Sequence, residues 1–234
     1  MGDGGVVIIG GTDGLGIGLA RHYASAGRRV VISGRDAERA AKAAAELGPN
    51  VSGVAFDLAE PTAISGALSG VEGPVDHLVL TPLERDQNTV RDYDVPSALR
   101  IVTLKLVGYT EVVHTMLDRL HDDSSILLFG GLAKERPYPG STTVTTVNHG
   151  VDGLVRAMSM ELAPIRVNAI HPGIVGDSPF WSAKPEALEA VKARALTGRF
   201  VLLEDIVNAA VMLLENPSIA ASELRVDGGW HLPI

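Results

Sequence analysis

The chain has 234 residues, of which 46% are hydrophobic and 21% are charged. This composition excludes an intrinsically disordered protein and allows one large domain with a buried core. A net charge of −8 argues against a general nucleic-acid-binding protein, because such proteins usually present a basic face. The chain has no cysteine, which excludes disulfides, cysteine-based zinc sites and a cysteine nucleophile.

The beginning of the chain, MGDGGVVIIGG, has no basic residues before its apolar run, and that run is too short for a signal peptide. No stretch approaches the roughly 18–20 apolar residues that a membrane-spanning helix requires. We therefore expect a cytoplasmic protein that associates with neither a membrane nor a nucleic acid.

Short β-branched segments alternate with longer Ala- and Leu-rich segments along the chain. In chain order, they predict a strand over residues 6–9, a helix over 15–26, a strand over 29–33, a helix over 36–47, a strand over 51–56, a helix over 60–68, a strand over 75–80, a helix over 96–120, a strand over 125–129, a helix over 141–162, a strand over 165–170, helices over 186–195 and 204–215, and a strand over 224–226. Gly27 is expected to stop the first of these helices, and Asp36 to cap the second. The alternation is typical of a parallel sheet with right-handed crossovers and helices on both faces. We predict a single doubly wound α/β domain over residues 1–234.

A glycine-rich turn joins the first strand to the first helix. Gly10, Gly14 and Gly16 follow the spacing Gly-x-x-x-Gly-x-Gly. Glycines at such a turn permit positive φ angles, a close approach of the backbone to a pyrophosphate and close packing of the helix on the strand. The first N–H groups of the helix would then face the phosphates. The turn therefore predicts a dinucleotide site, and an ordinary tight turn is the alternative.

The segment VVIIGGTDGLGIGLARHYASAGRRVVISGRD closely resembles the opening of the short-chain dehydrogenase/reductases. Four later landmarks carry the same resemblance: Asp57-Leu58, Glu161-Leu162-Ala163-Pro164 with Ile165-Arg166-Val167-Asn168, His171-Pro172-Gly173, and Val226-Asp227-Gly228-Gly229. They span nearly the whole chain in the family's order. The resemblance implies a Rossmann-type fold, a nicotinamide cofactor, a small-molecule substrate, and a homodimer or homotetramer built on the two long helices.

The residues after the second strand bear on the choice of cofactor. Gly34 falls where NAD-preferring relatives usually carry Asp, and Arg35 could pair with a 2′-phosphate. This favours NADP(H) over NAD(H), although Arg35 could instead be solvated. Asp13 lies where many NADP(H)-dependent relatives carry Arg or Lys. It would add negative charge near the phosphate unless it caps the helix and points away.

The turn and the resemblance together give a set of cofactor-binding candidates. They are Gly10, Thr12, Asp13, Gly14, Leu15, Gly16, Ser33, Arg35, Asp57, Leu58, Thr81, Pro82, Asn148, Pro172, Gly173 and Val175. Within this set, the resemblance implies that Asp57 and Leu58 contact the adenine ring. Asn148 could hydrogen-bond a ribose, and residues 171–175 resemble the loop that meets the nicotinamide carboxamide. Residues 176–200 correspond to the substrate lid of relatives. No metal site is predicted.

Typical members of the family use a Tyr as proton donor, a Lys four residues later, a Ser and an Asn. Counting back without gaps from Glu161–Pro164, the Tyr position is Val144, the Lys position is Asn148 and the Ser position is Gly131. The Asn position falls near residues 103–105. All four catalytic residues are therefore predicted to be replaced, and the family's usual proton relay is not expected.

Lys105 is the one candidate catalytic residue, because it lies among apolar residues of the long helix near the family's Asn position. A Lys in apolar surroundings has a lowered pKa and could act as acid or base, or hold a ribose hydroxyl. Alternatively, Lys105 lies on an oligomer face with its charged end in water. The loop after the predicted strand 125–129 borders the substrate site in relatives, and here it contains Lys134, Glu135, Arg136 and Tyr138. Polar residues on a loop are usually just solvated.

These observations predict an NADP(H)-binding oxidoreductase that reduces a carbonyl, C=C or C=N bond of a small molecule. The proton would come from Lys105, from water or from the substrate itself. Two alternatives remain. One is a cofactor-binding pseudoenzyme or sensor, and the other is a lyase, cyclase or isomerase on the same fold, since the fold alone does not fix the reaction.

Overall fold

The computed structural model describes residues 4–232, and residues 1–3 and 233–234 lie outside it. Residues 1–3 begin the segment that was tested above for a signal peptide. The elements are, in chain order, β1 (Gly5–Ile9), α1 (Gly14–Ser25), β2 (Val30–Gly34), α2 (Ala37–Leu47), β3 (Val51–Ala55), α3 (Ile64–Leu68), β4 (Val75–Leu80), α4 (Val95–Val102), α5 (Tyr109–Met116), β5 (Ser125–Phe129), α6 (Thr142–Glu161), β6 (Arg166–Pro172), α7 (Pro179–Ser182), α8 (Pro185–Arg194), α9 (Leu203–Glu215) and β7 (Glu223–Val226).

The seven strands form one parallel sheet in the order β3-β2-β1-β4-β5-β6-β7. Consecutive strands run outward from β1 in one direction and from β4 in the other. The fold is therefore the predicted doubly wound, Rossmann-type α/β architecture. The order reverses between β1 and β4, and in such sheets ligands bind in the crevice outside the carboxyl ends of the strands at this point.

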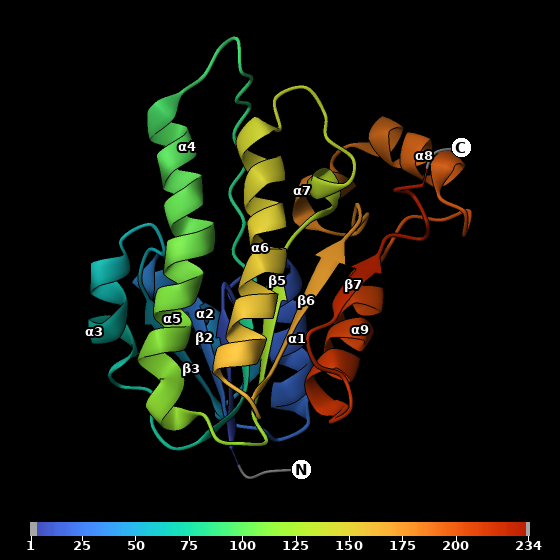
Figure 1. Cartoon of the computed structure of the whole chain (residues 1–234). Coiled ribbons are helices and arrows are strands. Elements are labelled where there is room, and N and C mark those ends of the chain that lie inside the picture. The colour runs from blue at the N-terminus through green and yellow to red at the C-terminus, as the bar shows by residue number, and fades with distance from the viewer. Residues whose placement is uncertain (1–3, 233–234) are drawn as a thin grey trace.

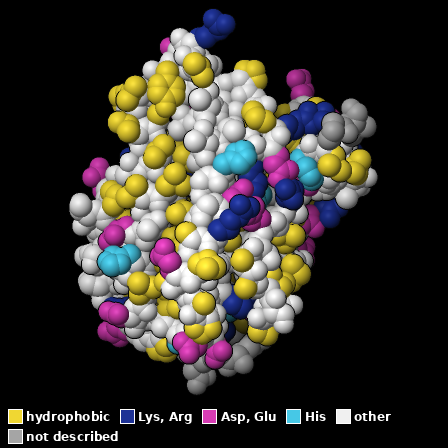
Figure 2. All heavy atoms as spheres, in the orientation of Figure 1, with side chains coloured by type: hydrophobic (Ala, Val, Ile, Leu, Met, Phe, Trp, Pro, Cys, Tyr) yellow, Lys and Arg dark blue, Asp and Glu magenta, His cyan; other side chains and the backbone are white. Residues whose placement is uncertain are grey.

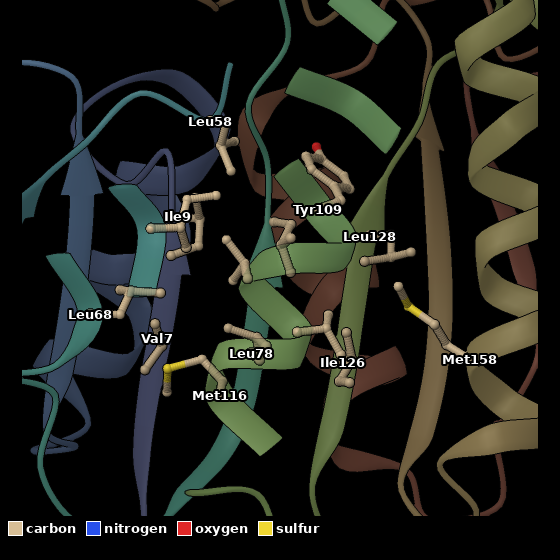
Figure 3. Close-up of a cluster of buried hydrophobic side chains, with 14 of the residues drawn as sticks. Val7, Ile9, Leu58, Leu68, Leu78, Tyr109, Met116, Ile126, Leu128 and Met158 are labelled. Carbon is tan, nitrogen blue, oxygen red and sulfur yellow. The ribbon is translucent and has the colours of Figure 1, made fainter. Parts of the chain in front are cut away.

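Helices cover both faces of the sheet (Figure 1). One apolar cluster joins the sheet to α3, α5 and α6, and a second joins it to α1, α2 and α9. The strands between the two layers are almost wholly apolar because both of their faces are buried. Figure 3 shows part of the first cluster, which includes Leu78, Tyr109 and Leu128, with the Tyr109 hydroxyl oxygen at its upper edge.

The long helix predicted over residues 96–120 is interrupted. It consists of α4, a π-helical turn over Thr103–Gly108, α5 and a final 3₁₀ turn over Leu117–Arg119. A Cβ atom on Gly108 would lie 2.4 Å from the Leu58 carbonyl oxygen, so glycine is needed where the helix passes the end of β3. π turns of this kind are often found at functional sites. Lys105 lies within this one.

Several local predictions are confirmed, and two need correction. The Asp36 side chain accepts the Arg39 N–H at 2.8 Å as the N-cap of α2, and Gly27 ends α1 with a φ of +77°. The helix predicted over residues 60–68 is instead a 3₁₀ turn (Pro61–Ala63) followed by α3. The single turn α7 was not predicted. Within residues 4–232, none of the helices has the length and apolarity needed to traverse a bilayer.

Candidate active site

The glycine-rich turn has the geometry that its sequence predicted. Gly10 and Gly14 have φ angles of +83° and +52°, and a Cβ atom on Gly16 would lie 2.2 Å from the Gly10 carbonyl oxygen. The Ser33 hydroxyl of β2 accepts the Gly10 N–H at 3.2 Å and fixes the start of the turn. A Cβ atom on Gly14 would meet nothing within 4 Å. The space in front of the α1 N-terminus is therefore open.

Asp13 caps α1, which was one of the two alternatives for this residue. Its carboxylate accepts the Gly14 N–H at 2.7 Å and pairs with Arg39 of α2 at 2.7 Å. The Arg39 charge therefore offsets the Asp13 charge. A Cβ atom on Gly34 would lie 2.8 Å from the Thr12 methyl carbon, so the Asp of NAD-preferring relatives would require Thr12 to move.

Four charged side chains form a network at the carboxyl ends of β2, β3 and β4. Arg35 Nη1 donates to Glu84 Oε1 at 2.7 Å. Arg100 of α4 donates to both Glu84 oxygens, at 2.7 and 2.8 Å, and to Asp57 Oδ2 at 2.9 Å. Burial alone would raise the pKa of Asp57, but hydrogen bonds from the Ala59 N–H and Arg100 hold that pKa below its usual value. The same bonds to Glu84 and Asp57 raise the pKa of Arg100.

The residues predicted above to replace the family's Tyr and Ser, Val144 and Gly131, carry no titratable group. Gly131 follows β5, and a Cβ atom there would lie 2.9 Å from Asn148 Nδ2. Asn148 of α6 therefore lies against Gly131. It is 2% exposed, and its buried Oδ1 atom has no hydrogen-bond partner within residues 4–232. Val144 is also buried. This region can accept a hydrogen bond but does not itself supply a titrating group.

Lys105 points inward and is 1% exposed, which excludes the alternative of a Lys with its charged end in water. Its Nζ atom donates to the Pro82 carbonyl at 3.1 Å and to Tyr109 Oη at 2.9 Å. Tyr109 in turn donates to the Pro82 carbonyl at 2.9 Å. Burial and, to a lesser degree, the charge of Arg85 lower the pKa of Lys105 to about 7, and burial raises the pKa of Tyr109.

Tyr109 was not predicted to be a site residue. A lysine followed four residues later by a tyrosine on one helix is a signal that could have revealed the pair, because such residues share a helix face. The Tyr109 hydroxyl also lies 3.4 Å from the Phe129 carbonyl at the end of β5. The pair therefore lies between the carboxyl ends of β4 and β5.

A second ionisable cluster lies beside Gly131. His171 of β6 is fully buried, and its Nδ1 atom accepts the Gly131 N–H at 3.1 Å. The Lys134 ammonium is 2.6 Å from Asp152, 3.3 Å from Glu223 and 3.3 Å from His171 Nε2. Burial and then the Lys134 charge lower the pKa of His171 to about 3. The ring is therefore neutral at pH 7.

Three members of this cluster, Asp152, His171 and Glu223, each bring a ligand atom within 4.8 Å of the others, a spacing that a metal ion could occupy. The Lys134 ammonium already lies among these atoms and supplies a positive charge. The prediction of a solvated Lys134 was therefore wrong. Of the other loop residues, Tyr138 is exposed as predicted, whereas Glu135 pairs with Arg225.

The remaining cofactor candidates line the same edge of the sheet or support it. The Thr81 hydroxyl donates to the Ile9 carbonyl at 3.0 Å and ties β4 to β1. Gly173 donates to the Val226 carbonyl at 2.8 Å after β6, and Val175 pairs with Val201. Pro172 ends β6. Two candidates direct apolar side chains inward: Leu58 is part of the core, and Leu15 packs against it.

The segment predicted to be a lid contains α7 and α8. Phe180 of α7 contacts two cations, with the Arg85 guanidinium 4.8 Å and the Lys184 ammonium 3.6 Å from the ring centroid. Arg85 belongs to the loop after β4, so this contact joins that loop to the segment over residues 176–200.

Comparisons with known proteins agree with the fold and the turn. The family described as enoyl-(acyl carrier protein) reductase matches residues 10–231. The 3-oxoacyl-[acyl-carrier-protein] reductase of Bos taurus is 30% identical over 96% of this chain and 97% of its own. The inactive 2-(S)-hydroxypropyl-CoM dehydrogenase 2 of Xanthobacter autotrophicus is 30% identical over 90% of this chain and 98% of its own.

A solved structure of a short chain dehydrogenase/reductase family protein superimposes with a TM-score of 0.86, at 26% identity and over 99% of both chains. The match to the family extends from the glycine-rich turn to the residues beyond β7. This family comprises oxidoreductases that bind a nicotinamide cofactor. The chain belongs to the short-chain dehydrogenase/reductase family.

Proposed function

We propose that this protein is an NADP(H)-dependent reductase of a small carbonyl compound, in which Lys105 supplies the proton. One observation carries this proposal: Lys105 is a buried amine with a pKa lowered to about 7 at the carboxyl ends of β4 and β5, whereas burial raises the pKa of its neighbour Tyr109. The 3-oxoacyl-[acyl-carrier-protein] reductase relative makes a 3-oxoacyl thioester the first substrate class to test.

The residues at the glycine-rich turn fit a dinucleotide. The open space before Gly14 allows phosphates to approach the α1 N–H groups, and the unpartnered Asn148 Oδ1 atom can accept a ribose hydroxyl. Arg35 uses only one nitrogen atom in its contact with Glu84, so further N–H groups remain for a 2′-phosphate. Leu58 can contribute only backbone atoms to an adenine site, because its side chain is buried.

A bound nicotinamide would supply a hydride to the carbonyl carbon, and the carbonyl oxygen would then need a proton. Lys105 holds that proton at Nζ. Two of its three N–H groups are used by Pro82 and Tyr109, which leaves the third for a water molecule or a substrate that reaches it. A pKa of about 7 suits a general acid near neutral pH, because both protonation states are accessible.

A cofactor-binding protein without turnover is the second candidate. Val144 and Gly131 carry no titratable group, and the Xanthobacter relative is itself described as inactive. In this case, the protein would bind NADP(H) and Lys105 would have only a structural role.

Further proposals concern the assembly of the protein, its lid and its location. Hydrophobic side chains are exposed over α4 (Figure 2), among them Val95 and Leu99, and Met160 is exposed near the end of α6. These helices would form the interface of a homodimer or homotetramer. Residues 176–200 would act as the lid of a single domain over residues 1–234, and the protein would be cytoplasmic.

The test begins with titration of NADPH and NADP⁺ into the wild type and Arg35→Asp, with Arg21→Asp as the control. Arg21 is an exposed residue of α1. We expect Arg35→Asp to weaken NADPH binding by at least about tenfold, because a charge that attracts the 2′-phosphate becomes one that repels it. If the wild type binds neither nucleotide, the proposed function is wrong.

The second step measures single-turnover oxidation of bound NADPH by a 3-oxoacyl thioester in the wild type and Lys105→Met. We expect Lys105→Met to keep NADPH affinity and to slow turnover by about 100-fold, as expected for the loss of a general acid. Equal rates would show that the proton comes from water or from the substrate. Binding without turnover in the wild type, over a panel of carbonyl substrates, would favour the second candidate.

A further inference from the structure

The contact between Arg35 and Glu84 crosses the nucleotide crevice. Arg35 follows β2, and Glu84 lies in the loop after β4. Because β1 lies between β2 and β4 in the sheet, the ion pair passes in front of the carboxyl end of β1, where the glycine-rich turn begins. In a doubly wound fold, this is the part of the crevice that receives a dinucleotide.

The two partners of Glu84 hold it with unequal strength. Arg100 binds both Glu84 oxygens in a bidentate contact, at 2.7 and 2.8 Å, and also donates to Asp57 at 2.9 Å. Arg35 adds a single bond at 2.7 Å, and its side chain is 67% exposed. A forked pair is the stronger arrangement, and a single exposed ion pair contributes little. Arg35 is therefore the partner that can leave, whereas Glu84 stays next to the crevice.

We propose that Glu84 is a specificity-determining residue whose carboxylate opposes the 2′-phosphate of NADP(H) at Arg35. This inference rests on the proposed function and concerns the balance between the two nicotinamide cofactors. When Arg35 turns to the 2′-phosphate, the Glu84 carboxylate remains bound to Arg100. Only the Arg35 guanidinium group then separates the Glu84 carboxylate from the doubly charged phosphate. Repulsion at that separation lowers the affinity for the phosphorylated cofactor and leaves the unphosphorylated cofactor little affected.

The other carboxylates near Arg35 do not have this relationship to it. Asp13 pairs with Arg39, and Asp36 accepts the Arg39 backbone N–H. Asp57 accepts hydrogen bonds from Arg100 and Ala59. Within residues 4–232, Glu84 alone forms an ion pair with Arg35. Neutralising Glu84 should therefore have the largest effect on a ligand bound by Arg35.

The test compares the binding of NADPH, NADH and adenosine 2′,5′-bisphosphate to the wild type, Glu84→Gln and Glu46→Gln. The control changes net charge equally, at an exposed residue at the far end of α2 whose partner is Lys42 at 4.0 Å. We expect Glu84→Gln to tighten NADPH and the bisphosphate by about tenfold and NADH by less than about twofold. Glu46→Gln should change none of these affinities.

Thermal unfolding of Glu84→Gln verifies that the variant is folded. Arg35→Gln, made in the wild type and in Glu84→Gln, shows whether the gain in NADPH affinity requires Arg35. Weaker NADPH binding by Glu84→Gln would mean that Glu84 positions Arg35, which overturns the proposal. Equal tightening of NADPH and NADH, or no change in either, also overturns it while leaving NADP(H) dependence intact. If neither cofactor binds to the wild type, the proposed function itself fails.

Discussion

Lys105 Nζ lies 2.9 Å from Tyr109 Oη, and both groups donate to the Pro82 carbonyl oxygen. Typical relatives carry Tyr and, four residues later, Lys on the helix that corresponds to α6. Here the same two residue types occur four residues apart in reverse order, on the neighbouring helix that contains the π turn. The pair is almost completely buried, so its protonation state is coupled to folding.

Lys105→Met should stabilise the protein at low pH. The pKa of Lys105 is about 7 in the folded chain against an ordinary 10.5, so the unfolded chain binds more protons between these values. The cost of burying the ammonium is therefore fully present below pH 7 and falls as the pH rises. We expect Lys105→Met to raise the free energy of unfolding by about 1–3 kcal/mol below pH 7. Urea unfolding from about pH 6 to 9.5 measures this quantity. A gain that did not shrink over this range would contradict the lowered pKa.

Tyr109→Phe should lower the pKa of Lys105 further. The hydroxyl accepts a hydrogen bond from the ammonium, and this favours the charged form. NMR titration of the Lys105 side chain follows the pKa, and Tyr93→Phe is the control because Tyr93 is exposed. We also expect a loss of about 1–2 kcal/mol in unfolding free energy from the missing hydrogen bonds. An unchanged or higher Lys105 pKa would show that Tyr109 does not stabilise the ammonium.

Lys134→Met should raise the pKa of His171 and destabilise the fold. The Lys134 charge is the second cause, after burial, of the low His171 pKa, and the variant removes the Lys134 ion pair from Asp152 and leaves Glu223 paired only with Arg156 among residues 4–232. Removal of one partner of a buried ion pair costs about 3–5 kcal/mol. Imidazole NMR titration and urea unfolding give the two readouts. The control is Lys192→Met, because Lys192 is exposed, and we expect it to change neither the His171 pKa nor the free energy of unfolding.

Gly16→Ala should abolish nucleotide binding. The added Cβ atom would lie 2.2 Å from the Gly10 carbonyl oxygen, so the turn must move to accept it. Gly66→Ala is the matched control, because a Cβ atom there meets nothing within 4 Å inside α3. We expect this control to bind NADPH normally and to gain about 0.5–1 kcal/mol in unfolding free energy. Nucleotide binding by folded Gly16→Ala would show that the turn does not hold the phosphates.

Local patterns were enough to predict the sheet, because each strand and helix carries its own signal. Apolar runs such as residues 6–9 and 126–129 predicted buried parallel strands, and Gly27 and Asp36 marked helix ends through their own backbone and side-chain geometry. The long helix was the exception. Its π turn was not predicted, and the close approach of Gly108 to the Leu58 carbonyl, 50 positions apart in the chain, is a tertiary contact that no local pattern shows.

The candidate site divides in the same way. The sequence by itself determined the glycine-rich turn and the residue types at Val144, Asn148 and Gly131, since backbone conformation and residue type are local properties, whereas the burial of Lys105 was decided by the structure. Only the tertiary structure decided the partners of the charges. Arg35 meets Glu84 across 49 positions of chain, and Lys134 meets Glu223 across 89. An ion pair depends on distances in space between side chains, and the packing of the whole sheet sets those distances.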